Sequence, residues 1–206
     1  MVTAQSRLHI SPEEYLARER KSEERHEYAG GKIYAMAGES PEHSTVCFNL
    51  SGLTHAQLTG KNCRGFSPNM KVRVGESGKY YYPDLSVVCG EPVFQDERRD
   101  VLINPRVIIE VLSPSTEKKD RGEKLQNYQQ IESLTDYLLV SQDKPLIEHY
   151  VRREGNQWLY SSFSDLASSV HIASIDCRLS LAEVYDRVTF PPTEPSEEQA
   201  ADGEED

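Results

Sequence analysis

The chain has 206 residues, of which 37% are apolar and 28% charged, enough for the core of one domain with a small appendage. It has no apolar run of about 18 residues that could span a membrane, and Met1 to Arg7 lack the apolar stretch of a signal peptide, so we expect a cytoplasmic protein without a membrane partner. A net charge of −11 argues against a nucleic-acid-binding surface spread over the whole molecule.

The first third of the chain predicts two helices separated by a hairpin. Ser11, followed by proline and two glutamates, is typical of a helix start, and this helix is expected to run to about residue 20. Residues 25–34 read as two strands joined by a glycine turn. A second helix is expected from Ser40 to about Gly60, because its apolar residues recur at roughly helical spacing.

The rest of the chain predicts strands and two further helices. Strands are expected at about 63–74, 79–89, 106–112, 136–141, 146–152 and 158–163, and helices at about 116–131 and 181–185. A polar connection through residues 95–100 precedes the third of these strands. This order of elements predicts an α/β or α+β fold in which helices flank a mixed sheet.

The C-terminal segment differs in composition from the rest. Residues 191–206 contain seven acidic and no basic side chains, which leaves 27 acidic against 23 basic residues before them. We predict a domain over residues 1–190 and a disordered acidic tail over 191–206. The tail could simply keep the protein soluble, or it could mimic phosphate and shield a basic groove.

The cysteines form no C-x-x-C pair and lie in largely apolar segments. The four residues are Cys47, Cys63, Cys89 and Cys177. We therefore expect reduced core cysteines rather than disulfides or a zinc site.

Two apolar segments each carry one carboxylate. Asp84 precedes a run of leucine and valine, and Glu110 lies inside a run of isoleucine, valine and leucine. Such runs predict buried strands, and a carboxylate is almost never fully buried without a partner. Burying an unpaired charge costs roughly several kcal/mol of folding free energy, so we expect the two acids to share a cation.

A lysine is the third element of the predicted site. The helix after Glu110 carries Asp120, Lys124 and Tyr128 at intervals of four residues, so the three side chains lie close to one stripe. If the helix folds back, Lys124 approaches both carboxylates. Two acids, a divalent ion and an ammonium group are suited to phosphodiester hydrolysis.

These residues carry a resemblance to a known family. The chain is similar to the Uma-type family of restriction-endonuclease-like proteins, within the PD-(D/E)xK nuclease superfamily, over roughly residues 9–185. The resemblance is carried by Arg25-His26-Glu27-Tyr28, Gly31, His43, Pro83-Asp84, the run Ile109-Glu110-Val111-Leu112-Ser113-Pro114-Ser115-Thr116, Asp120, Lys124 and Tyr128. It implies an α-β-β-β-α-β core with additional C-terminal strands.

The resemblance also implies roles. Asp84 and Glu110 would bind Mg²⁺, with Mn²⁺ as a substitute, and Glu27 would be an auxiliary catalytic acid. The superfamily's usual lysine position, two residues after the strand glutamate, is Leu112 here. The resemblance to the Uma-type family implies that Lys124, on the next helix, takes over the role of that lysine.

Several residues are candidates for nucleic-acid contacts, which would make binding steeply salt-dependent. They are His43, Lys71, Arg73, Lys118, Lys119, Arg121 and Tyr128. The lysines and arginines could instead form solvated faces, His43 could be a general base or an exposed helix residue, and Tyr128 could pack in the core. No recognition-helix signature indicates a sequence preference.

The leading hypothesis is a Mg²⁺-dependent endonuclease that acts on DNA, in which Asp84, Glu110, Lys124 and Glu27 are catalytic. The alternative is a catalytically silent nuclease fold that binds nucleic acid or protein, since a fold alone does not fix a function. A glycosidase acid/base pair is a weaker alternative, because sugar clefts usually have aromatic platforms and the chain has one tryptophan. A homodimer is plausible by analogy with enzymes that cut both strands of a duplex.

Overall fold

A mixed sheet of six strands forms the centre of the structure, a computed structural model that describes residues 9–36, 38–75 and 78–192. The strand order is β11-β10-β9-β8-β6-β3, in which β8 and β9 are parallel and the other neighbours are antiparallel. The strands are β3 (Cys63–Phe66), β6 (Leu85–Cys89), β8 (Val107–Leu112), β9 (Asp136–Ser141), β10 (Ile147–Arg152) and β11 (Trp158–Phe163). Every residue of β8 and β9 is buried, as expected for strands covered on both faces.

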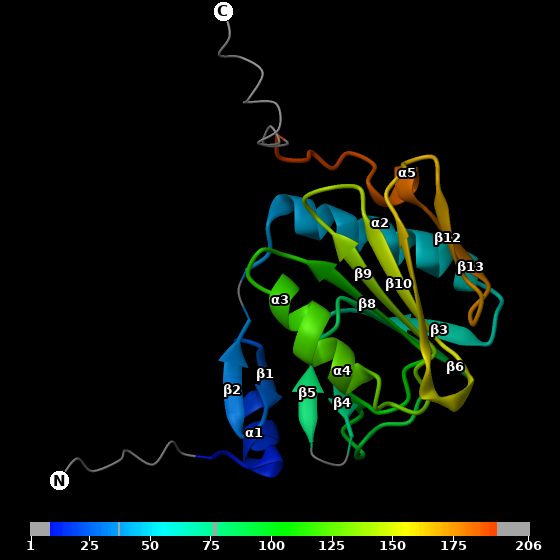
Figure 1. Cartoon of the computed structure of the whole chain (residues 1–206). Coiled ribbons are helices and arrows are strands. Elements are labelled where there is room, and N and C mark those ends of the chain that lie inside the picture. The colour runs from blue at the N-terminus through cyan, green and yellow to red at the C-terminus, as the bar shows by residue number, and fades with distance from the viewer. Residues whose placement is uncertain (1–8, 37, 76–77, 193–206) are drawn as a thin grey trace, which may run out of the picture.

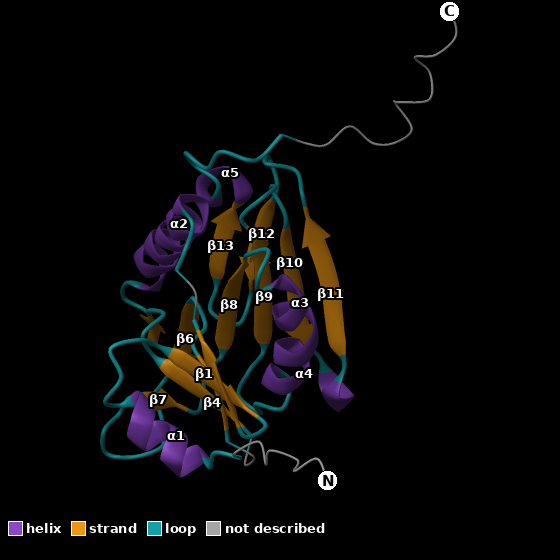
Figure 2. Cartoon of the chain, turned by 90° about the vertical axis from the view of Figure 1, so that its left-hand side faces the viewer, coloured by secondary structure: helices purple, strands orange, loops and turns teal. Residues whose placement is uncertain are grey.

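Helices cover both faces of this sheet, as Figures 1 and 2 show. On one face lie α2 (Pro41–Leu58), α5 (Leu181–Val184) and a hairpin of β12 (Ser169–Ile172) and β13 (Cys177–Ser180). Their apolar side chains pack against the odd-numbered residues of β8. On the other face lie α3 (Glu117–Lys119) and α4 (Leu125–Tyr128), and Tyr128 packs in the core over the even-numbered residues of β8.

A second sheet lies beside one end of the first, together with the first helix (Figure 2). Its order is β2-β1-β5-β4-β7. The elements are α1 (Pro12–Glu19), β1 (His26–Ala29), β2 (Lys32–Ala35), β4 (Lys71–Val74), β5 (Lys79–Tyr81) and β7 (Val101–Leu102). The strands β1 and β2 form the predicted hairpin, and its turn places Gly30 and Gly31 at positive φ angles of 57° and 77°.

The predicted helix starts are confirmed by their caps. The side chain of Ser11 accepts a hydrogen bond from the Glu14 amide at 3.2 Å, and Ser40 accepts one from the His43 amide at 3.1 Å. Both helices therefore begin where the sequence predicts. This fixes the start of α2, from which His43 projects toward the end of β8.

Two of the predicted strands are broken in the structure. The segment 63–74 divides into β3 and β4, and the segment 79–89 divides into β5 and β6, with each half in a different sheet. Proline stands in each break, at Pro68 and Pro83, and proline cannot donate to a strand ladder. The second break places Asp84 at the junction of the two sheets.

The predicted helix over 116–131 is also irregular. Residues Asp120–Lys124 form a π-helical turn between α3 and α4, and the Leu125 amide donates to the carbonyl of Asp120, five residues earlier. A π turn inserts one residue into a helix and is frequent at functional sites. The strands β7, β12 and β13, which are only two to four residues long, were not predicted.

The expectation of four reduced cysteines is wrong for two of them. Cys63 on β3 and Cys89 on β6 face each other in the antiparallel register and form a disulfide, whereas Cys47 and Cys177 are free thiols. The sequence alone does not indicate this pair, because the two cysteines are 26 positions apart and only strand pairing brings them together.

Of the predicted tail, residues 193–206 lie outside the described residues. Among the described ranges, no helix combines the length and apolarity needed to cross a membrane.

Candidate functional site

Glu110 lies near the end of β8 on the face that α4 covers. Its side chain is 4% exposed, and its Oε1 atom accepts a hydrogen bond from the Tyr128 hydroxyl at 2.8 Å and from Lys124 Nζ at 3.2 Å. Burial raises the pKa of Glu110 well above its usual value, and the Lys124 ammonium only partly opposes this. The buried acid predicted from the sequence is therefore present, with one direct cationic partner among the described residues.

Asp84 lies beside Glu110 at the start of β6. Leu85 pairs with Ile109 in the antiparallel register, so the next position outward sets Asp84 against Glu110. The Val111 amide donates to Asp84 Oδ2 at 2.7 Å, which anchors the carboxylate to the end of β8. Burial raises the pKa of Asp84, against the charge of His43 and the Val111 hydrogen bond. The structure therefore brings the two predicted ligands to one place.

Lys124 projects from the π-helical turn into a cage of three carboxylates. Its Nζ atom lies 2.8 Å from Glu27 Oε1, 3.1 Å from Asp120 Oδ1 and 3.2 Å from Glu110 Oε1, and its side chain is only 6% exposed. Burial works to lower the pKa of Lys124, but the three carboxylates outweigh it and raise that pKa well above its usual value. The ammonium is therefore charged and held against the strand glutamate, as predicted.

Glu27 enters the site from β1 of the hairpin. Its Oε2 atom accepts a hydrogen bond from Lys119 Nζ at 2.5 Å, and its Oε1 atom contacts Lys124. Burial works to raise the pKa of Glu27, but the two ammonium groups prevail and lower it. An acid that could have been exposed beside a turn is thus buried and ionised.

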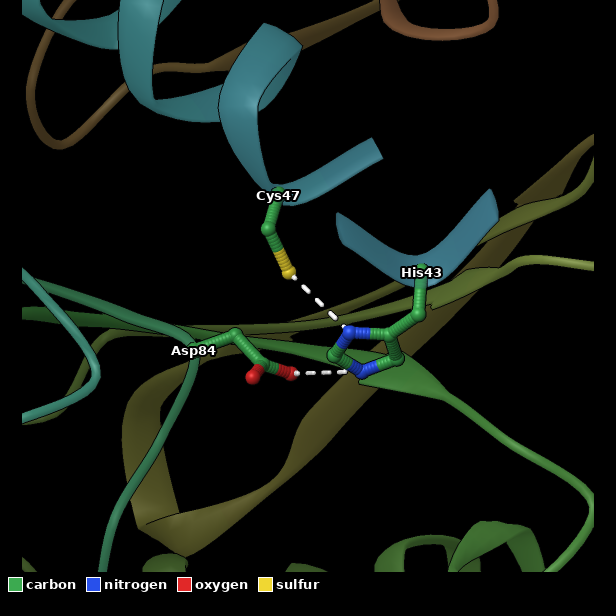
Figure 3. A group of neighbouring side chains, drawn as sticks. All are labelled: His43, Cys47 and Asp84. Carbon is green, nitrogen blue, oxygen red and sulfur yellow. Dashed lines mark hydrogen bonds and ion pairs between the residues drawn. The ribbon is translucent and has the colours of Figure 1, made fainter. Parts of the chain in front are cut away.

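His43 connects α2 to the same strand end (Figure 3). Its Nε2 atom lies 3.0 Å from the carbonyl oxygen of Val111 and 3.6 Å from Asp84 Oδ2, and its Nδ1 atom lies 3.5 Å from Cys47 Sγ. Because a carbonyl only accepts, the Nε2 atom donates the hydrogen bond to Val111. Burial raises the pKa of Cys47, which keeps the thiol protonated.

The side chains of His43, Cys47 and Asp84 are not arranged to bind one metal ion together, although one ligand atom of each lies within 4.8 Å of the others. The thiol and the carboxylate approach opposite nitrogens of the imidazole ring (Figure 3). A single ion binds only one of these nitrogens. Cys47 was not anticipated as a neighbour of the site, although its spacing of four residues from His43 on one helix would have indicated it.

A cavity of about 510 Å³ joins these groups. Its walls come from the β2–α2 connection on one side and the loop after β8 on the other. The lining includes Glu27, Tyr34, Met36, Glu39, His43, Tyr82, Asp84, Glu110, Ser113, Ser115, Thr116, Lys119, Asp120 and Lys124. The cavity is therefore bordered by polar groups drawn from both faces of the central sheet.

The donor set suits a hard divalent cation. Among the described side chains, Asp84 Oδ1 and Glu110 Oε2 accept no hydrogen bond, while the other oxygen of each carboxylate is engaged. Glu27 Oε1 and Asp120 Oδ1 are buried and accept no hydrogen bond of good geometry, although both lie near Lys124. Carboxylate oxygens are the ligands that Mg²⁺ prefers. The acids therefore have spare oxygens for an ion.

The remaining predicted nucleic-acid contacts are placed less favourably. Tyr128 is fully buried and donates to Glu110, so its hydroxyl orients the acid and faces no phosphate. Lys71 is 7% exposed at its side chain and pairs with Asp100 at 3.1 Å. Arg121 is ion-paired with Glu117 and Glu148. The prediction that Tyr128 and Lys71 contact nucleic acid is therefore wrong, because Glu110 and Asp100 already bind these two side chains.

Three other basic candidates keep more contact with solvent. Lys118 is exposed and Arg73 is half-buried. Lys119 lines the cavity with a side chain that is 26% exposed. Their predicted phosphate contacts stay predictions.

Comparison with known proteins places the chain in a family. The family model described as "Uma2: Putative restriction endonuclease" matches residues 12–182. Two proteins of Synechocystis sp. (strain ATCC 27184 / PCC 6803 / Kazusa) are each 36% identical, and both are described as uncharacterized. The first, slr1290, is matched over 182 residues (88% of this chain and 94% of the relative), and the second, sll1609, over 159 residues (77% and 89%).

A solved structure supports the fold. The crystal structure of "a putative nuclease belonging to DUF820" from Anabaena variabilis ATCC 29413 superposes with a TM-score of 0.71 at 21% identity, over 85% of this chain and 97% of that one. This confirms the predicted fold class, in which helices flank a mixed sheet. Because the family model and both relatives match most of its length, the chain belongs to the Uma2 family.

Proposed function

We propose that this protein is an endonuclease that hydrolyses DNA phosphodiester bonds with Mg²⁺, for which Mn²⁺ substitutes. The proposal is supported by the family, which is described as "Putative restriction endonuclease", and by one observation above all. Two carboxylates with raised pKa values, Asp84 and Glu110, adjoin a caged ammonium group, Lys124, at the base of a cavity. Perturbed acids converging in a cleft are typical of a catalytic site.

The residues divide into four roles in this proposal. Asp84 and Glu110 would hold the ion, which when bound neutralises phosphate charge and acidifies water. Lys124 stabilises negative charge that develops on the phosphate, because its ammonium is desolvated and already oriented. Glu27 and Asp120 hold that ammonium in place. Tyr128 fixes Glu110 from the core side.

The test is plasmid nicking in Mg²⁺ and in Mn²⁺ by the parent and by Glu110→Gln and Lys124→Ala. We expect each variant to lose at least about a hundredfold in rate, the order of magnitude for loss of a main electrostatic group. Glu148→Gln is a matched control, because Glu148 is a buried acid on β10 of the same sheet outside the cavity. Parent-level activity in both Glu110→Gln and Lys124→Ala would refute the assignment.

One specific observation favours the alternative function, a catalytically silent nuclease fold that binds nucleic acid or protein. Leu112 occupies the usual lysine position, and it is buried in the core against α4. DNA binding that needs no metal and leads to no cleavage would favour this alternative. The plasmid assay combined with a binding measurement without divalent ions distinguishes the two functions.

A further inference from the structure

We infer that the site accepts a single strand or a splayed end of DNA in preference to an intact duplex, and that a base of this strand stacks on Tyr34. The inference rests on the proposed function and adds the substrate class to it. It depends on three observations, which are the depth of the acids, the pairing of the nearby cations and the position of Tyr34.

The reacting groups lie deep in the cavity. Glu110 is 3% exposed and Lys124 4%, beneath walls formed by the β2–α2 connection and the loop after β8. A cavity of about 510 Å³ is in the range that encloses a small molecule, and hence about one nucleotide. A duplex is a far larger body, with a major groove alone about 12 Å wide. A flexible single strand can lower one phosphate to these acids more readily than a duplex can.

The two lysines that line the cavity are both engaged. Lys119 pairs with Glu27, and Lys124 pairs with Glu27, Glu110 and Asp120. Binding of a duplex rests mainly on many phosphate contacts from free lysine and arginine. The chain has a net charge of −11, so it is poorly supplied with such contacts. Affinity is therefore expected to need a contribution other than charge.

Tyr34 can supply that contribution. It lies on the edge strand β2, lines the cavity and keeps 40% of its surface exposed. The ammonium of Lys119 lies 4.5 Å from the centroid of its ring. An exposed aromatic ring is the platform on which single-stranded sites stack a base, and the neighbouring ammonium adds a cation–π contact to the ring.

The experiment compares three DNA substrates of one sequence, a single strand, a fork with splayed arms and a blunt duplex, in Mg²⁺. We expect the single strand and the fork arms to be cut at least about tenfold faster than the duplex. Tyr34→Ala should lower the single-strand kcat/KM about tenfold through KM, as expected for a lost stacking contact, and Tyr34→Phe should restore it. Equal or faster cutting of the duplex by the parent would overturn the inference.

Tyr160→Ala is the matched control, because Tyr160 is 49% exposed on β11 and does not line the cavity. It should cut the single strand as the parent does, and an equal loss in Tyr34→Ala and Tyr160→Ala would also overturn the inference.

Failure of the proposed function looks different, since Glu110→Gln would then match the parent on every substrate. In that case fluorescence anisotropy decides. Tighter binding of the single strand, weakened by Tyr34→Ala, supports the inference, and equal or tighter duplex binding overturns it.

Discussion

Glu110 is the residue whose environment conflicts most with its chemistry. It is a carboxylate inside a six-residue strand that is buried throughout, and burial raises its pKa well above the usual 4.5. The folded protein therefore holds its proton more tightly than the unfolded chain does. The stability that this acid contributes is complete below about pH 4.5 and is lost as the pH rises through the raised pKa. Such a cost is typical of a position kept for function.

Replacing Glu110 by glutamine should therefore stabilise the metal-free protein at pH 8. Glutamine keeps the shape and can still accept from Tyr128, but it does not ionise. We expect a gain of about 0.5–2 kcal/mol in the free energy of unfolding, shrinking as the pH falls toward 4.5. Urea denaturation at several pH values in the presence of a chelator measures it. A variant less stable than the parent at pH 8 would contradict the prediction.

Replacing Lys124, in contrast to replacing Glu110, should lower the free energy of unfolding. Replacing it by methionine leaves Glu27, Glu110 and Asp120 buried around a missing cation, a defect that costs about 3–5 kcal/mol. We expect millimolar Mg²⁺ to recover part of this loss, because the ion supplies positive charge to the same acids. Urea denaturation with and without Mg²⁺ tests both statements. No effect of Mg²⁺ on the variant would count against an ion at this site.

The π-helical turn is the element that positions this lysine. It adds one residue between α3 and α4, so that Asp120, Lys124 and Tyr128 all face the end of β8. Gly122 lies inside the turn, and an added Cβ atom there would meet no atom within 4 Å. Glycine is thus not required for space at this position.

Gly122→Ala should raise the free energy of unfolding by about 0.5–1 kcal/mol, because alanine restricts the unfolded chain and favours the helix. Gly30→Ala is the matched control. An added Cβ at Gly30 is equally free of contacts, but its φ of +57° disfavours alanine, and we expect a loss of about 1–2 kcal/mol. Thermal unfolding measures both. The same sign in both variants would show that backbone conformation does not decide their effect.

The disulfide between Cys63 and Cys89 links two secondary-structure elements, the strands β3 and β6. It closes a loop between residues 26 positions apart and ties the edge strand to the strand that follows Asp84. Cys89→Ser should lower the free energy of unfolding by about 2–4 kcal/mol under oxidising conditions. With a reductant present, parent and variant should nearly coincide. A difference that persists in reductant would place the effect in packing and not in the bond.

At the scale of the whole molecule, charge limits how DNA is bound. The net charge is −11, and seven of the acidic residues lie in the last sixteen positions. Removing residues 193–206 makes the protein less negative, so we expect tighter DNA binding at low salt, with the difference fading at about 0.2 M salt. Anisotropy titrations of the full and shortened chains measure it. Equal affinities at low salt would show that the tail does not compete with DNA.

The sequence alone determined most of the elements and the main participants of the site. Local rules are sufficient for these, since the caps at Ser11 and Ser40, the hairpin turn and the apolar run around Glu110 are all read within a few neighbouring residues. The spacing of Asp120, Lys124 and Tyr128 likewise survives in the structure, although through a π turn.

Only the tertiary structure decided which groups meet. The caging of Lys124 by Glu27, the approach of His43 to Asp84 and the bond between Cys63 and Cys89 join segments that are 26 to 97 residues apart. Pairing over such distances depends on how sheets and helices pack, and no local pattern encodes it. For the same reason the sequence misplaced Lys71 and Tyr128, whose partners are set by burial and not by spacing.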